Sequence, residues 1–367
     1  MPRARRQASF SGRRQASFIL LLILLLLAGF EAGARAIVSY PPIFRRVARQ
    51  SSPAWRLEWA KRRRSSLPAP YTFDVYDPER GWALQGGLRS FTMPEGKSLS
   101  TSSRGVRSEV EIPYEHPARG RRIAVLGDSF TFGEGVSDRE AYPFVLDQLL
   151  AEHEVINFGV HGYGLDQMLL YLRTEVVKYR PDVVVLGYVD EDIYRNLLSF
   201  RDYAKPRYLL LSDRSLRLEN VPVARPEDLL STELLYPRAL DLIEMTLQAR
   251  RWRNGANRRE AQTISRAILE EIVHSVRGAK AVPLFVYLPV ADDLLDRSPA
   301  LNRGERFLSS VCARAGLRFH SLRPGISAAI DPADRRAARG HWPARVHALA
   351  AAGIRDILIA EGEVDHR

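Results

Sequence analysis

The chain has 367 residues, 46% of them hydrophobic, which is enough for one large domain or two modest ones with a real core. Its net charge of +11 does not indicate a nucleic-acid-binding protein, because the basic residues concentrate early and flank an apolar segment. The single cysteine, Cys312, excludes an intrachain disulfide framework and a cysteine-based zinc site.

The first feature along the chain is an uncharged, leucine-rich segment from Ser17 to Phe30. Five arginines precede it within the basic region 1–16, and this order is typical of a signal sequence. It could be cleaved near the small residues around Ala34, or it could remain as an anchor over residues 17–40. The high leucine content and the arginine at position 35 favour the anchor. We therefore predict a single-pass protein of a bacterial inner membrane, with the bulk of the chain in the periplasm.

Residues 41–67 form a basic juxtamembrane stretch. A short helix is expected to begin at Ser52, with Trp55 and Trp59 one turn apart. Aromatic and basic residues in this pattern suit the lipid headgroup zone, although a solvated linker is an equal alternative. Residues 68–120 are rich in proline, glycine and serine, and we expect an irregular lead-in that contains short strands.

From residue 121 the pattern becomes an alternation of strands and helices. Short apolar runs without polar alternation predict buried parallel strands. These runs are Ile123–Leu126, Val155–Phe158, Asp182–Gly187, Val282–Tyr287 and Leu317–His320. The apolar spacing between these strands predicts helices. Strands and helices together predict a three-layer α/β domain over residues 121–362. An insertion at 197–259 is expected to contain a hairpin and a helix at 234–247, and to form a wall or lid of the pocket.

The most informative motif is the sequence GDSFTFG, residues 127–133, which directly follows the first predicted strand. It places the hydroxyl of Ser129 where a strand turns into a helix, at the edge of the sheet that carries ligand sites in open α/β folds. A serine there can act as a nucleophile, with backbone N–H groups nearby to hold an oxyanion. The alternative is a serine that merely caps the helix.

Four blocks in order make residues 121–360 resemble the SGNH (GDSL-type) hydrolase family. They are GDSFTFGEGV at 127–136, VINFGVHGYG at 155–164, the strand PDVVVLG at 181–187 with its loop, and GHW at 340–342. The resemblance implies a flavodoxin-like parallel sheet of about five strands. It also implies Ser129 as nucleophile, His341 as general base, and an oxyanion hole formed by the N–H groups of Ser129 and Gly159. No cofactor is implied, and three consecutive acids at 190–192 cannot all face one metal ion.

Two positions depart from the family pattern. Glu191 or Asp192 stands where the family has an asparagine that binds the oxyanion, and an ionised carboxylate cannot donate a hydrogen bond. The triad acid is expected two or three residues before His341, but those positions hold Arg339 and Ala338. Asp334 or Asp331 could serve only if the loop folds back. His347 is the alternative to His341 as the base.

The sequence therefore predicts an ester hydrolase or O-acyltransferase that works through Ser129 and His341. Its expected substrate is an acyl ester, most plausibly on a carbohydrate of the cell envelope, and its expected contact with the membrane is the anchor. The two missing residues support a rival hypothesis. In that alternative, the chain keeps the fold but only binds a glycan or a partner protein of the envelope.

Overall fold

A five-stranded parallel sheet forms the centre of the computed structural model, which describes residues 5–41, 44, 51–64, 72–94, 96–296, 298–331, 333–334, 338 and 340–365. The strand order is β11-β10-β7-β5-β6, and every neighbouring pair is parallel. The strands are β5 (Arg122–Gly127), β6 (Glu154–Gly159), β7 (Val183–Tyr188), β10 (Val282–Tyr287) and β11 (His320–Ser321). The predicted sheet of about five parallel strands is confirmed, and the order is that of flavodoxin-like folds.

Helices cover both faces of this sheet. One face carries α5 (Tyr142–Leu149), α13 (Arg323–Ala329) and α15 (Ala344–Ala360), and the other carries α6 (Leu165–Thr174), α10 (Ala256–Gly278) and α12 (Arg303–Ala315). Alternate residues of β5 enter different cores: Ile123 packs with the first group, and Ala124 packs with the second. This two-sided burial explains the uninterrupted apolar runs in the sequence.

The last strand begins three residues later than predicted. After α12 the chain turns at Gly316, which has the left-handed backbone of a helix C-terminus, and Leu317 N–H bonds to Cys312 O at 2.9 Å. Leu317 is therefore still part of the helix end. The chain pairs with β10 only from His320 onward.

The lead-in consists of two small antiparallel pairs that lie against the main domain. β1 (Asp74–Asp77) pairs with β2 (Gly81–Leu84), and β3 (Phe91–Thr92) pairs with β4 (Ser98–Leu99). A buried arginine, Arg107, follows them and joins this region to the loop after β5.

The insertion contains the expected hairpin, formed by β8 (Arg207–Leu210) and β9 (Leu216–Glu219). The single helix predicted at 234–247 is wrong, because two helices occur there, α8 (Pro226–Leu235) and α9 (Arg238–Arg253). The break falls at Tyr236 and Pro237. Proline disfavours a helical backbone in the residue before it and has no N–H to donate, so one helix ends and another begins.

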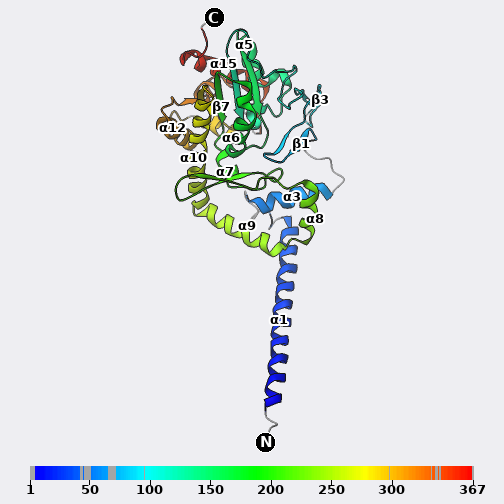
Figure 1. The fold of residues 1–367 in the computed structure, drawn as a ribbon. Helices are drawn as coiled ribbons and strands as arrows, with labels where there is room; N and C mark the ends of the chain where they lie inside the picture. Colours follow the sequence, from blue (N-terminus) through cyan, green and yellow to red (C-terminus); the bar gives the residue numbers. More distant parts are fainter. Residues whose placement is uncertain are drawn as a thin grey trace.

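The N-terminal helix α1 (Arg5–Ser39) projects from the domain (Figure 1). Within the described residues, Arg14–Ser39 form a stretch long and apolar enough to cross a membrane. At the domain, the carboxylate of Glu31 accepts hydrogen bonds from the N–H groups of Arg238 and Ala239, at 3.0 and 2.9 Å. These are the first residues of α9, so α1 caps that helix and is joined to the head.

A short helix, α3 (Ser52–Arg64), begins where the sequence predicts it. Its packing differs from both alternatives considered for this stretch. Trp59 is buried and lies 5.6 Å from the ring of Phe200 and 5.5 Å from that of Tyr203. The aromatic residue that looked suited to lipid headgroups is instead part of the core. Residues 42–43, 45–50 and 65–67 of the predicted linker lie outside the described residues.

Candidate active site

Ser129 is the first residue of a one-turn helix, α4 (Ser129–Phe132), that follows β5. Asp128 caps this helix, and its Oδ1 accepts the N–H of Phe130 at 3.0 Å. The turn requires glycine at position 127, since a Cβ there would lie 2.0 Å from Thr131 Oγ1. The N–H of Ser129 has no partner within so short a helix, which leaves it available to a ligand. The cap of this helix is thus Asp128 and not Ser129, and Ser129 lines the pocket.

His341 lies directly beside this serine. Its Nε2 is 2.9 Å from Ser129 Oγ, although 212 residues separate the two in the chain. The ring also rests against Phe130, with centroids 5.3 Å apart. The next residue, Trp342, is buried and donates its Nε1–H to Pro289 O at 2.9 Å, which fixes the loop that carries the histidine. The two residues expected to be nucleophile and base are brought within hydrogen-bonding distance.

Among the described residues, the carboxylate that pairs with His341 is Glu134, which the sequence does not single out. Glu134 Oε2 lies 3.5 Å from His341 Nε2. This is the same ring nitrogen that contacts Ser129 Oγ. Asp331 and Asp334 instead pair with Arg345, at 3.1 and 3.5 Å. Among the described residues, neither Asp331 nor Asp334 forms a hydrogen bond or an ion pair with His341. The only signal for Glu134 was its place in the serine block, five residues after Ser129.

Two of the three glycines of the second block, Gly159 and Gly162, have different roles. The N–H of Gly159 is already bonded to Asn157 Oδ1 at 2.9 Å, and a Cβ on Gly159 would lie 2.1 Å from Phe132 N. Gly159 therefore permits close packing of β6 on α4, and its N–H does not face the pocket as the resemblance implied. Gly162 lines the same pocket as Ser129 and has a φ of +75°, a conformation that favours glycine.

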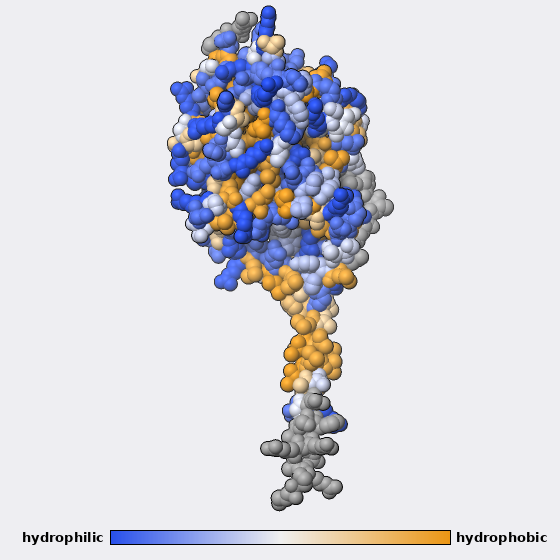
Figure 2. Space-filling model, in the orientation of Figure 1, coloured by the Kyte–Doolittle hydropathy of each residue, from blue (hydrophilic) through white to orange (hydrophobic). Residues whose placement is uncertain are grey.

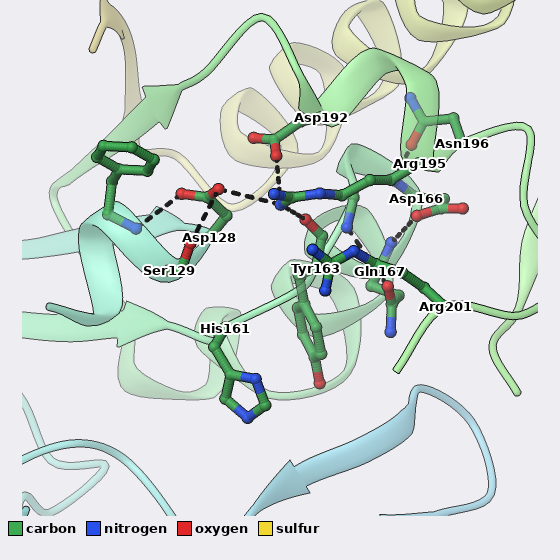
Figure 3. A network of polar contacts seen from close by, with 12 residues as sticks. Asp128, Ser129, His161, Tyr163, Asp166, Gln167, Asp192, Arg195, Asn196 and Arg201 are labelled. Atoms are coloured by element: carbon green, nitrogen blue, oxygen red, sulfur yellow. Dashed lines mark hydrogen bonds and ion pairs between the residues drawn. The ribbon is translucent and has the colours of Figure 1, made fainter. Parts of the chain in front are cut away.

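A buried arginine occupies the region where the family asparagine was expected (Figure 3). Arg195 belongs to α7 (Asp192–Arg195), and its Nη1 donates to Asp192 Oδ1 at 2.6 Å, Asp128 Oδ2 at 3.0 Å and Tyr163 O at 2.7 Å. Burial alone would lower the pKa of Arg195, but Asp192 and Asp128 outweigh it and raise that pKa. The guanidinium is therefore charged, and it lies next to Asp128, the residue that caps α4.

The two acidic candidates for the asparagine position are separated by the fold. Glu191 lines the pocket, whereas Asp192 is fully buried and turned toward Arg195. Burial, with Asp128 nearby, raises the pKa of Asp192 well above its usual value. Asn196 is committed elsewhere, because it accepts from Asp166 N–H at 3.1 Å and donates to Ser265 Oγ at 2.8 Å.

The pocket around Ser129 has a volume of about 270 Å³ and a wall rich in charged groups. Besides Ser129, His341 and Gly162, the charged or polar contributors are Glu134, Glu191, Arg195, Arg201 and Asp292. Arg201 is held by Asp202, and its guanidinium lies 5.0 Å from the ring of Trp55. Arg201 belongs to the insertion, which thus forms part of the wall as predicted, and α3 packs behind it through Trp55.

His347, the alternative base, is a buried structural residue. Its Nδ1 accepts the N–H of Tyr142 at 3.2 Å, which requires a neutral ring. Burial lowers the pKa of His347 to about 3, and the charges of Arg107 and His341 act in the same direction. A base with a lower pKa in the folded state binds fewer protons there than in the unfolded chain, so acid favours unfolding.

We expect the free energy of unfolding to fall by up to about 1.4 kcal/mol per pH unit as the pH drops from about 6.5 toward 3. His347→Gln keeps an acceptor for the Tyr142 N–H and removes the titrating group, so the fall with pH should be shallower. Urea unfolding of the full chain at several pH values measures this slope. The matched control is His274→Gln, at an exposed position of α10, which should leave the slope unchanged. Equal slopes in all three proteins would contradict the assignment.

Comparison with known proteins identifies a family. A family model described as the GDSL-like lipase/acylhydrolase family matches residues 125–352. Among curated proteins, none matches the sequence. Similar solved structures include a lipase/acylhydrolase from Enterococcus faecalis, with 16% identity over 66% of this chain and 96% of that chain and a TM-score of 0.37. A GDSL-like lipase from Bacteroides thetaiotaomicron shows 13% identity over 66% of this chain and 89% of that chain, with a TM-score of 0.36. The family model matches more than half of the chain, and the assignment of the chain to a family depends on this match alone.

Proposed function

Because the chain belongs to the GDSL-like lipase/acylhydrolase family, we propose that it breaks or transfers acyl esters in the pocket around Ser129. The observation that carries this proposal is the distance of 2.9 Å between His341 Nε2 and Ser129 Oγ. A base within hydrogen-bonding reach of a hydroxyl is what converts a serine into a nucleophile. A fold kept only for binding has no need of this alignment.

In the proposed reaction, His341 Nε2 takes the proton of Ser129 as Oγ attacks the acyl carbon. The tetrahedral intermediate collapses when the carbon–oxygen bond to the alcohol breaks, and His341 returns the proton to the leaving alcohol. The acyl-serine then reacts with a second hydroxyl, which His341 deprotonates in turn. If this hydroxyl is water the enzyme is an esterase, and if it belongs to a sugar the enzyme is an acyltransferase.

The oxyanion of the intermediate needs hydrogen-bond donors. We assign this role to the N–H groups of Ser129 and Gly162, in place of the Ser129 and Gly159 pair. The third donor of the family, the asparagine amide, is replaced by the cation of Arg195. Its side chain is only 10% exposed, it lines the pocket, and its described hydrogen bonds use Nη1 alone. A fixed positive charge in a buried site stabilises a developing negative charge strongly.

The pocket favours a small acyl group on a polar alcohol. Charged or polar side chains make up seven of the twelve residues that line it, and its volume does not suit a long acyl chain. Together with an N-terminal helix that can span a membrane, this supports an envelope carbohydrate as the substrate, in the periplasm of a bacterium. Glu134, at 3.5 Å from His341, would stabilise the imidazolium formed during attack.

The test uses the full chain in lipid nanodiscs. A small fluorophosphonate should add once to the wild type and not to Ser129→Ala, as read by intact mass. Ser231→Ala, at an exposed serine of α8, is the matched control and should react like the wild type. p-Nitrophenyl acetate should be cleaved faster than the octanoate. Absence of an adduct on folded wild-type protein would refute the enzyme and favour the binding module, whose affinity for glycans would not change in Ser129→Ala.

A further inference from the structure

Helices α8 and α9 expose large apolar side chains that nothing in the described part of the chain covers. Leu235 is 86% exposed, Leu240 51%, Ile243 45% and Leu247 55%; we call these four residues the α8–α9 apolar face. The last three follow the i, i+3, i+7 spacing of one helix side. The other side of α9 buries Arg238, Asp241 and Met245 against the domain. The apolar side of the helix therefore points away from the protein core.

This face lies where α1 leaves the domain. Glu31, which caps the first turn of α9, comes directly after Phe30, the last residue of the leucine-rich run. The apolar surface of α1 continues onto the base of the head (Figure 2), at the end of the domain where α8 and α9 lie (Figure 1). The beginning of α9 is thus level with the end of the leucine-rich run, residues 17–30, which is the height of the headgroup layer if this run is the part of α1 within the bilayer.

We propose that the α8–α9 apolar face is a docking surface for the lipid bilayer that α1 crosses. An amphipathic helix of this kind lies in the interfacial layer, with its apolar side among the upper acyl carbons. Two exposed arginines of the last turn, Arg250 and Arg253, fit the phosphates of anionic lipids. The inference rests on the proposed membrane anchor and is independent of the proposed ester chemistry.

Docking in this way would set the orientation of the catalytic site. Arg121, just before β5, bonds to Glu363 near the C-terminus, which lies at the end of the molecule far from α1 (Figure 1). The carboxyl ends of the strands, where Ser129 and α7 lie, consequently face the α1 end. The pocket wall reaches α3 through the contact between Arg201 and Trp55. The bilayer contact would hold the pocket at a fixed height above the membrane, suited to esters presented at its surface.

The experiment measures the depth of a nitroxide label in nanodiscs of phosphatidylethanolamine and phosphatidylglycerol. Labels are attached to Leu240→Cys in a Cys312→Ala background, and their collisions with oxygen and with a water-soluble nickel complex are compared. We expect Leu240 to be reached more readily by oxygen than by nickel. Leu149→Cys, at an exposed position of α5 far from α1, is the matched control and should show the opposite preference. Far-UV circular dichroism melts confirm that each variant is folded.

The accessibilities of the labels at Leu240 and Leu24 distinguish failure of the docking proposal from failure of the anchor. Nickel access at Leu240 equal to that at Leu149 would overturn the proposal, since the face would then be in water. Low access of both reagents at Leu240 would also overturn it, and would show that a protein partner or a second copy covers the face. A label at Leu24→Cys reports on the anchor itself: nickel access there would remove the premise, whereas a lipid-exposed Leu24 with a water-exposed Leu240 would refute the docking alone.

Discussion

Replacing both Ser129 and His341 by alanine is expected to cost no more activity than replacing either one alone. The serine hydroxyl and the histidine ring act as one unit, because the base has no function without the nucleophile 2.9 Å from it. We expect each single variant to lose about 10⁴-fold or more in kcat, and the double variant to stay within about threefold of the singles. The values are read from p-nitrophenyl acetate hydrolysis by the full chain in nanodiscs, with folding checked by thermal melts.

A double variant that loses the product of the two single effects would mean that the residues contribute independently, against the proposed mechanism. Asp334→Asn is the control for the acid that the sequence analysis considered. Its carboxylate pairs with Arg345 at 3.5 Å, so we expect a change of less than about twofold in kcat. A loss of about 100-fold or more in this variant would instead restore Asp334 as the partner of His341.

The sequence was sufficient for the parts of the fold that follow from local apolar patterns. Buried parallel strands read as short continuous apolar runs, and four of the five lie within one or two residues of their predicted bounds. What failed depends on tertiary contact. Trp59, with basic residues after it, has the pattern of a membrane-surface residue, but Phe200 and Tyr203 of the insertion bury it. No local pattern reports a neighbour that lies more than 140 positions away.

The candidate site divides in the same way. Ser129 and His341 stood in short motifs at strand and helix ends, and the structure places them together. Gly162 stood in a block with two other glycines, and the sequence does not tell which of them faces the pocket. The structure does, because the Gly159 N–H is bonded to Asn157 and Gly162 lines the pocket. Arg195 was the hardest to find, since its partner Asp128 is 67 residues away and an arginine has no fixed place in the motif.

The largest expected loss of stability comes from Arg107, which joins the lead-in to the loop after Ser129. Its guanidinium donates to the carbonyl oxygens of Phe132, Gly133 and Val136, at 2.7, 2.8 and 2.9 Å, and its Nε pairs with Asp138 at 3.0 Å. Both charged side chains are at most 5% exposed. Arg107→Met keeps an unbranched apolar stem but removes the guanidinium, which leaves a buried carboxylate and several carbonyls unpaired. We expect the free energy of unfolding to fall by about 3–5 kcal/mol.

Urea unfolding of the full chain, followed by tryptophan fluorescence, measures this loss. Arg139→Met makes the same change at a pair with Glu109, where the arginine side chain is 75% exposed, and should change the stability far less than Arg107→Met. Adding Asp138→Leu to Arg107→Met should recover part of the loss, because the uncompensated charge is then removed. Equal, small effects at Arg107 and Arg139 would mean that the buried pair does not hold the loop. If Arg107 holds this loop, Arg107→Met should also have lower activity at temperatures well below its melting temperature, since the same loop carries Glu134 beside His341.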